Sequence, residues 1–488
     1  GHSGAFEKVH LPGREGEGPH GQALLQDQRP PGAVGPGEAP AHLPQSENVW
    51  TLDLPDRETV RNLWELRDDQ IVPLHIARTP NWSPDPAAPD MRAGWAVWDR
   101  TRRNSGDEDE RRQKWLRGTD PEHLTRFTAE QLVGATLCGE CGGMMGYNET
   151  CTVRTFDPET GSILCDYPTY RRRPPEGTRY FLENRLAFLD RPGEFHFDPH
   201  RHRLYLRLPD DRNPNKAHIE AGTRAHIVTG HNVDNLRISG LTFRFNTNTD
   251  PFTPGFDGDY RNPACIFLTG GAHNVVVRNC RFEHVPMAVV ARQTERSQLL
   301  DRFTVADNDI LRASEGGMRL GLRWQNAYRI RFLRNRFREC SFTAQFPAAN
   351  LEGWRLSEVA GNVFLHNGGL GVQVYSGKQG SHSADRRDVP LVRHLVHHNR
   401  AEDCLKMAND YGQIEVWQAG PFYLYGNVSG NPGGYWHWRH TNTPPEERDF
   451  RSARFAYAYY LDGAFQSYLF NNIAWGANND LASPLCNT

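Results

Sequence analysis

One short phrase recurs eight times between residues 235 and 475 of this 488-residue chain, each time as an alternating strand that runs into a turn. Examples are NLRISGLTF at 235–243, VVVRNCRF at 275–282 and FYLYGNVSG at 422–430. Asparagine tolerates left-handed backbone and forms side-chain ladders, so one strand–turn unit per coil predicts a parallel β-helix. The turn residues that we place in one register are Gly240, Asn279, Asn308, Asn335, Asn362, Asn399, Asn427 and Asn472.

The intervals between these asparagines argue against an antiparallel sandwich. They are 29, 27, 27, 37, 28 and 45 residues, so two coils carry insertions. Hairpin-connected strands would instead show turn signals about every 8–12 residues. We therefore expect at least seven stacked coils across residues 232–475.

Each coil also contains a second strand, and these strands should stack into one long sheet. The stacking places Glu415 beside Tyr460 and Trp417 beside Asp462, and side-chain alternation puts all four on one face. With coils about 4.8 Å apart, the Cα atoms of Glu415 and Asp462 should be about 8 Å apart. The expected second strands are 265–270, 287–292, 317–323, 342–348, 370–376, 413–418 and 457–463.

Three acids at this level are candidate catalytic residues. Glu415 interrupts the apolar run GQIEVWQAG, where burial without a partner would be costly. Desolvation raises the pKa of a carboxyl group, so Glu415 is the candidate general acid and should face a cleft, with Ile414 and Val416 in the core. Asp462, before a glycine at a strand end, is the candidate carboxylate, and Asp410 is the reserve for either role.

A second polar column follows four places after the turn asparagines. A groove and a solvated edge are equally good interpretations of it. In the groove interpretation Glu339, His366 and Asp403 share a concave surface with Glu415, and Lys406 adds charge at the same level. The column comprises Glu283, Arg312, Glu339, His366, Asp403 and Asn431.

The insertion before Asn472 contains GYWHWRH, residues 434–440. Its rings could stack on sugars and its arginine could pair with an acidic sugar, although an aromatic loop that packs over the coil is the alternative. The candidate substrate-binding residues are His366, Asp403, Lys406, Trp417, Trp436, His437, Trp438 and Arg439.

The N-terminal half lacks the asparagine period. Residues 49–230 hold strand-like runs such as VWTLDL and RLYLRL, which favour a β-sandwich-like module. Residues 1–48 have no clear structural signal, and residues 231–488 form the predicted β-helix domain.

Charge and hydropathy exclude two classes of partner. The formal charge of −3 and pI of about 6.8 give no electrostatic case for nucleic acid. No apolar run approaches the roughly 20 residues that span a bilayer. The opening GHSGAFEKVH lacks the basic and apolar regions of a signal peptide, but a mature protein would have lost them, so a secreted or periplasmic location is an inference.

Nine cysteines leave an odd count. Cys138, Cys141, Cys151 and Cys165 lie within 28 residues at spacings that fit zinc patterns poorly, which favours disulfides over a zinc knuckle. Cys265, Cys280, Cys340 and Cys404 lie in strand-like runs and are expected in the core.

Two segments carry a family resemblance. RYFLENRLAFLDRPGEFHFDPHRHRLYLRLPD, residues 179–210, and LHIARTPNW, residues 74–82, resemble segments of bacterial right-handed parallel β-helix carbohydrate-active proteins. This group includes glycoside hydrolase family 141 and, more distantly, the β-helical xylosidases of family 120. The resemblance covers most of residues 50–475. It implies a right-handed parallel β-helix, an inserted or preceding β-sandwich module, a carbohydrate substrate, and a catalytic pair at Glu415 and Asp462.

The chain departs from this group at both ends. A Gly-Thr-x-x-x-Pro-type opening is not found, and the chain stops at LASPLCNT just after a coil. Because an uncapped coil exposes edge backbone, we expect either a longer natural protein or a second subunit that covers the coil end.

Three functional classes remain open. A glycoside hydrolase would use the carboxyl pair. A polysaccharide lyase would use Lys406 as base, with Arg439, His437 or a bound Ca²⁺ neutralising a uronate. Asp257 and Asp259 of FDGDY could hold that Ca²⁺, although an ordinary acidic loop is the simpler interpretation, and no cofactor is otherwise expected. A non-catalytic glycan-binding β-helix would use the acids only as a polar ladder.

Overall fold

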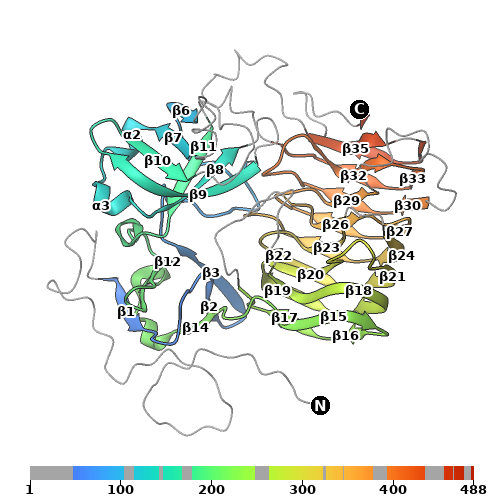
Figure 1. Ribbon diagram of the computed structural model, residues 1–488, viewed down its shortest axis with the longest axis horizontal. Helices are drawn as coiled ribbons and strands as arrows, with labels where there is room; N and C mark the ends of the chain where they lie inside the picture. Colours follow the sequence, from blue (N-terminus) through green and yellow to red (C-terminus); the bar gives the residue numbers. More distant parts are fainter. Residues whose placement is uncertain are drawn as a thin grey trace, which may run out of the picture.

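Two sheets of mostly antiparallel strands lie beside a stack of parallel coils in the computed structural model (Figure 1). The candidate residues Trp436, His437, Trp438 and Arg439, and also Asp257 and Asp259, lie outside the described part of the chain. The structure describes residues 48–88, 90–103, 115–141, 147–166, 178–247, 263–322, 326–343, 346–376, 393–434, 456–464, 466–476 and 485–487.

The coils have three parallel faces, and β18 runs through the first two. First-face strands are β15 (Val228–Asp234), β18 (Ala264–Arg278), β20 (Met287–Arg292), β23 (Met318–Gly321), β26 (Ala349–Glu352), β29 (Val372–Tyr375), β32 (Tyr411–Ala419), β35 (Ala456–Ala464) and β38 (Leu485–Asn487). Second-face strands are β16 (Arg237–Ser239), β21 (Leu300–Ala306), β24 (Ala327–Leu333), β27 (Leu356–Ala360), β30 (Arg393–His397), β33 (Phe422–Tyr425) and β36 (Ser467–Phe470).

The third face confirms the predicted number of coils. Its 8 strands stack in parallel in chain order, one from each coil. They are β17 (Thr242–Arg244), β19 (Arg281–Val285), β22 (Asp309–Ala313), β25 (Arg336–Arg338), β28 (Val363–Leu365), β31 (Arg400–Glu402), β34 (Val428–Gly430) and β37 (Ile473–Trp475). The fold is therefore all-β with a parallel β-helix, as expected.

An asparagine ladder joins the second and third faces. The backbone N–H and side-chain amide of Asn335 both donate to Oδ1 of Asn362, at 2.9 and 3.1 Å, and Asn362 donates in the same way to Asn399. Each ladder amide also donates to a carbonyl of the preceding coil, so a fully buried polar side chain is satisfied. The ladder residues are Asn308, Asn335, Asn362, Asn399, Asn427 and Asn472.

The predicted position of Asn279 in this ladder is wrong by one residue. Arg278 pairs with Ala306, so the residue aligned with Asn308 is Cys280, whose N–H donates to Asn308 at 3.0 Å. The left-handed turn position and the ladder position, which the prediction placed on one asparagine, belong to two neighbouring residues. The left-handed position precedes the ladder position and is occupied by Gly240, Asn279, Asp307, Arg334, Gly361, His398, Gly426 and Asn471.

The same shift corrects the start of the second polar column. Glu283 pairs with Leu311 inside the third face, so His284 rather than Glu283 aligns with Arg312. The column is a second left-handed turn position, with φ values near +50° at each residue. It comprises His284, Arg312, Glu339, His366, Asp403 and Asn431.

One predicted strand is also misplaced. The run FTAQFPA at 342–348 was expected to form a first-face strand, but the strand of that coil is β26, Ala349–Glu352. Pro347 lies in the predicted run, and proline has no N–H to donate to a ladder. The strand therefore begins after it.

The N-terminal part forms two sheets, each with its own hydrophobic cluster. The six-stranded sheet contains β1 (Trp50–Asp53), β13 (Arg203–Arg207), β12 (Glu194–Asp198), β3 (Gln70–Ile76), β2 (Leu63–Arg67) and β14 (His218–Ala221). The second sheet contains β4 (Arg78–Thr79), β5 (Ala96–Val97), β6 (Arg100–Arg103), β7 (Trp115–Thr119), β8 (Thr136–Cys141), β9 (Tyr147–Asp157), β10 (Ser162–Asp166) and β11 (Arg179–Glu183).

Short helices complete this part. They are α2 (Pro121–Leu124), α3 (Ala129–Leu132) and the 3₁₀ helices Leu186–Phe188, Pro209–Asp211 and Pro214–Lys216. No helix in the described residues is long and apolar enough to cross a membrane. The sandwich arrangement and the domain boundaries stay predictions.

Three cysteines of the N-terminal part do not form the disulfides that were expected. Cys138, Cys151 and Cys165 are buried free thiols, so the disulfide expectation is wrong for these three. The side chain of Cys141 is not among those that the structure describes. Cys265, Cys280, Cys340 and Cys404 lie in the β-helix core, as expected.

Candidate active site

The predicted strand register around Glu415 is confirmed. On the first face, Glu415 pairs with Gln373 of the preceding coil and Tyr460 of the following coil, and Trp417 pairs with Asp462. Ile414 and Val416 belong to the apolar core. Alternation therefore directs Glu415 and Trp417 to the outer side of β32.

Glu415 is nevertheless buried, with only 2% of its surface exposed. The prediction that Glu415 faces a cleft and is only partly desolvated is therefore wrong. Its Oε1 accepts a hydrogen bond from the Gln373 amide at 2.6 Å, and its Oε2 accepts one from the N–H of Gly412 at 3.0 Å. Both oxygens thus already have donors from the protein.

Burial also changes the protonation of this carboxyl. The pKa of Glu415 is raised to about 8, chiefly by desolvation and to a lesser extent by the charges of Asp462 and Asp410, while the two hydrogen bonds oppose the shift. At neutral pH the side chain therefore holds a proton.

Asp410 lies directly before β32, at a left-handed φ of 64°, and is only partly buried. Its pKa is raised to about 6, chiefly by desolvation and then by the charge of Asp462, while a hydrogen bond from Tyr460 opposes the shift. Asp462 is also partly exposed, on β35. Asp410 and Glu415 both respond to the charge of Asp462, so the three carboxyls form one electrostatic cluster.

Aromatic rings lie beside this cluster. The rings of Trp417 and Tyr375 are 4.4 Å apart at 32°, and those of Tyr457 and Tyr460 are 5.1 Å apart. Tyr375 is buried, whereas Trp417 is partly exposed next to Asp462. Trp417 is thus placed where one ring face could contact a sugar.

A buried polar row that was not predicted lies on the same face. Arg319, Asn350 and Gln373 occupy the positions aligned with Glu415 in the three preceding coils, and each is 7% exposed or less. Glu352 lies next to this row and pairs with Arg319 at 3.2 Å. The signal was present in the alternation of ANLE at 349–352 and VQVY at 372–375, where a polar residue takes an outward position.

His366 and Asp403 come together in the second turn column. The Nδ1 of His366 lies 3.2 Å from a carboxylate oxygen of Asp403, and their side chains are 47% and 33% exposed. Asp410 and Asp462, rather than the column residues, are the acids whose charges shift the pKa of Glu415. That the column lines the same groove as Glu415 stays a prediction.

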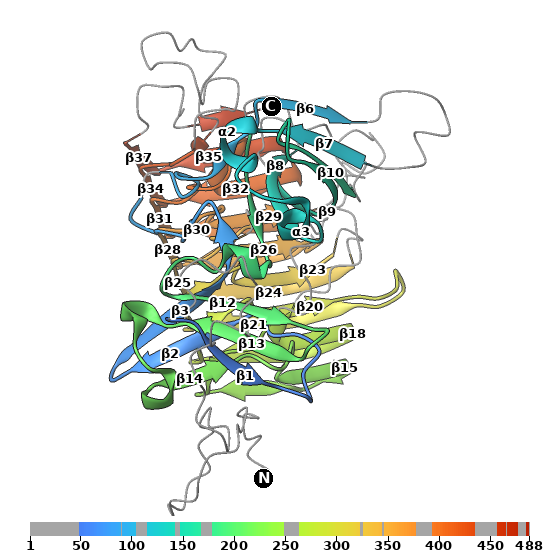
Figure 2. The same cartoon turned by 90° about the vertical axis from the view of Figure 1, so that its left-hand side faces the viewer.

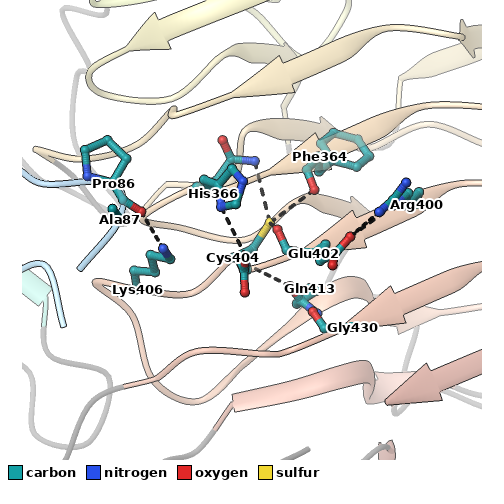
Figure 3. A network of polar contacts seen from close by, with 12 residues as sticks. Pro86, Ala87, Phe364, His366, Arg400, Glu402, Cys404, Lys406, Gln413 and Gly430 are labelled. Atoms are coloured by element: carbon teal, nitrogen blue, oxygen red, sulfur yellow. Dashed lines mark hydrogen bonds and ion pairs between the residues drawn. The ribbon is translucent and has the colours of Figure 1, made fainter. Parts of the chain in front are cut away.

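Lys406, a candidate substrate-binding residue, contacts the N-terminal part of the chain. It is 7% exposed, and its ammonium donates to the carbonyl of Pro86 in the N-terminal part (Figure 3). The next residue, Met407, packs into an apolar cluster with Trp82 and Trp95. Lys406 thus joins the coils to the loop before β5.

The comparisons with known proteins support the fold. No family model matches the chain, and no curated protein matches it. A solved structure titled "Glycoside hydrolase" superimposes with a TM-score of 0.54 and covers 90% of this chain and 80% of that chain, at 14% sequence identity. At this identity the likeness shows the class of fold, an all-β protein with parallel coils.

Proposed function

We propose that this protein is a carbohydrate-active enzyme that hydrolyses glycosidic bonds. The observation that carries the proposal is the cluster of Asp410, Glu415 and Asp462 on two adjoining coils, in which the charge of Asp462 raises the pKa of the other two carboxyls. Glycoside hydrolysis needs one carboxyl that holds a proton and one that is ionised. The structural likeness to a glycoside hydrolase is consistent with this chemistry.

Asp410 is the proton donor in this proposal. It is partly exposed, and a pKa of about 6 suits a group that must hold a proton and release it near neutral pH. It would protonate the leaving glycosidic oxygen. Asp462 remains the carboxylate that acts as nucleophile or as base toward water, and Trp417 would stack on the sugar beside it.

Glu415 takes a positioning role. Its Oε2 holds the N–H of Gly412, two residues after Asp410, and its Oε1 holds Gln373. This anchors the backbone on which Asp410 adopts its left-handed conformation. The burial of Glu415 and the donors on both of its oxygens argue against its giving a proton to substrate.

The direct test is activity on a panel of plant and algal polysaccharides. Hydrolysis gives new reducing ends without ultraviolet absorption, whereas a lyase gives an unsaturated product that absorbs. New reducing ends that vanish in Asp462→Asn would support the proposal. Products that absorb in the ultraviolet would overturn it.

The pH dependence separates Asp410 from Glu415 as the acid. A general acid must be protonated, so kcat/KM should fall as pH rises through the pKa of the donor in the free enzyme. With Asp410 as donor the fall should be centred near pH 6. A fall centred near pH 8 would instead identify Glu415.

Glu415→Gln should lower kcat by about tenfold with little change in KM, because the amide keeps the shape and weakens the anchor of Gly412. The fall in kcat/KM near pH 6 should persist.

The raised pKa means that native Glu415 holds its proton at pH values where the unfolded chain has lost it. Wild-type stability should therefore decrease as pH rises from about 4.5 to about 8.

Urea unfolding at several pH values measures the free energy of unfolding. Between about pH 4.5 and about pH 8 this free energy should decrease less in Glu415→Gln than in the wild-type protein. Loss of the pH 6 limb in Glu415→Gln would contradict the positioning role.

A further inference from the structure

A cleft of about 390 Å³ lies between the six-stranded sheet and the first coils. One wall comes from β2 and β3, and the opposite wall contains His284 and Arg312 of the second turn column. Figure 2 shows β2, β3 and β14 of the N-terminal part in front of these coils. The volume falls in the range of about 300–1,000 Å³ that is usual for small-molecule sites.

This cleft is separate from the carboxyl cluster. Arg312 and Asp403 occupy the same column three coils apart, which corresponds to about 14 Å along the helix at about 4.8 Å per coil. Asp410, Glu415 and Asp462 do not line the cleft. The loop that carries Pro86 does, and Lys406 holds that loop in place.

The lining carries more positive than negative charge. Arg61, Arg78 and Arg312 face the cleft together with one acid, Glu183. Glu183 lies between two of them, 3.6 Å from Arg61 and 3.4 Å from Arg78. Arg312 donates to Glu339 at 2.7 Å through its Nε. Three guanidinium groups thus share two carboxylates.

Most N–H donors of the Arg61 guanidinium are not used within the described residues. Its side chain is 12% exposed, yet within the described residues its guanidinium has one ion pair at 3.6 Å and no hydrogen bond. A guanidinium carries five N–H donors, and a carboxylate or sulfate accepts two of them at once. Arg78 is held more firmly, because it also donates to the carbonyls of Ile76 and Trp82 at 3.1 and 3.4 Å.

Two neutral histidines and apolar side chains complete the walls. Burial, and then the charge of Arg78, lowers the pKa of His75 to about 3, and burial with Arg312 lowers that of His284 to about 4. Neutral imidazoles can exchange hydrogen bonds with hydroxyl groups. Trp64, whose ring lies 4.7 Å from that of Phe245, adds an apolar surface.

We propose that this cleft binds a sugar ring that bears a carboxylate or a sulfate group, with Arg61 and Arg312 as the anion anchors. The site lies apart from the proposed hydrolytic centre, and the choice of a sugar as its ligand rests on the proposed function. The surplus of guanidinium donors selects the anion, and the histidines and apolar walls accept the ring.

Isothermal titration of the full chain with glucuronate, glucose 6-sulfate and glucose tests the proposal. At least one acidic sugar should bind at least tenfold more tightly than glucose, and added salt should weaken that binding. Binding is measured on Asp462→Asn, so that turnover plays no part. Tight binding of glucuronate alone supports a uronate ligand, and tight binding of glucose 6-sulfate alone supports a sulfated one.

Arg61→Gln should lower the affinity by at least tenfold. Arg312→Gln is the second variant, because Arg61 also pairs with Glu183 and its loss could affect folding. Arg331→Gln is the matched control, since Arg331 is 61% exposed on the second face. Equal affinity for glucose and the acidic sugars, or unchanged affinity in Arg312→Gln and in a folded Arg61→Gln, would overturn the proposal.

Discussion

In the proposed hydrolysis, Asp462→Asn should lower kcat by at least about 10³-fold. The amide keeps the size of the side chain on β35 but cannot act as nucleophile or base. Steady-state kinetics with a reducing-end assay measures the loss. The substitution also removes the negative charge that raises the pKa of Asp410, so any residual activity should have its basic limb below pH 6.

Asp410→Asn should lower turnover by about 10²–10⁴-fold, the usual contribution of a general acid. The double variant should lose far less than the product of the two single losses, because paired groups act as a unit. Asp234→Asn is the control, since Asp234 is 70% exposed on the first coil. Activity within a fewfold of wild type in Asp462→Asn would contradict the carboxyl mechanism.

Asn362→Ala should lower the free energy of unfolding by about 3–5 kcal/mol. Asn362 is fully buried, accepts from the N–H and amide of Asn335, and donates to Phe332 and Asn399. Alanine leaves several of these buried groups without partners, at about 1–3 kcal/mol for each unsatisfied group, reduced where the coil can relax.

Urea unfolding measures this change, with Asn81→Ala as the control. Asn81 is exposed, and its amide donates to Asp190 at the surface at 2.8 Å, so its loss should change stability by less than about 1 kcal/mol. A similarly small change in Asn362→Ala would show that the ladder does not stabilise the coils.

The register of consecutive coils could be predicted from the sequence alone. The turn asparagines repeat in the order in which the coils stack, and alternation within each strand separates Ile414 and Val416 from Glu415. Both signals are local, since each coil pairs with its neighbours in the chain. The pairs Glu415–Tyr460 and Trp417–Asp462 follow from them directly.

The second coil, which contains β18 and β19, shows the limit of that signal. Asn279 and Cys280 are adjacent, and residue type favoured Asn279 for the ladder. Its left-handed φ of 53° and the hydrogen bond from the N–H of Cys280 to Asn308 place the ladder one residue later. Hydrogen-bond geometry decided the register there, because the left-handed and ladder positions are neighbours that both accept asparagine.

The environment of each candidate residue was decided only by the tertiary structure. Pairing between coils does not say which distant segments cover an outward face, so the burial of Glu415 and its raised pKa could not be read from β32. Lys406 binds Pro86, which lies 320 residues away in the chain. Sequence determined the periodic scaffold because repeated coils make local contacts, whereas the chemistry of the sites depends on contacts between distant parts of the chain.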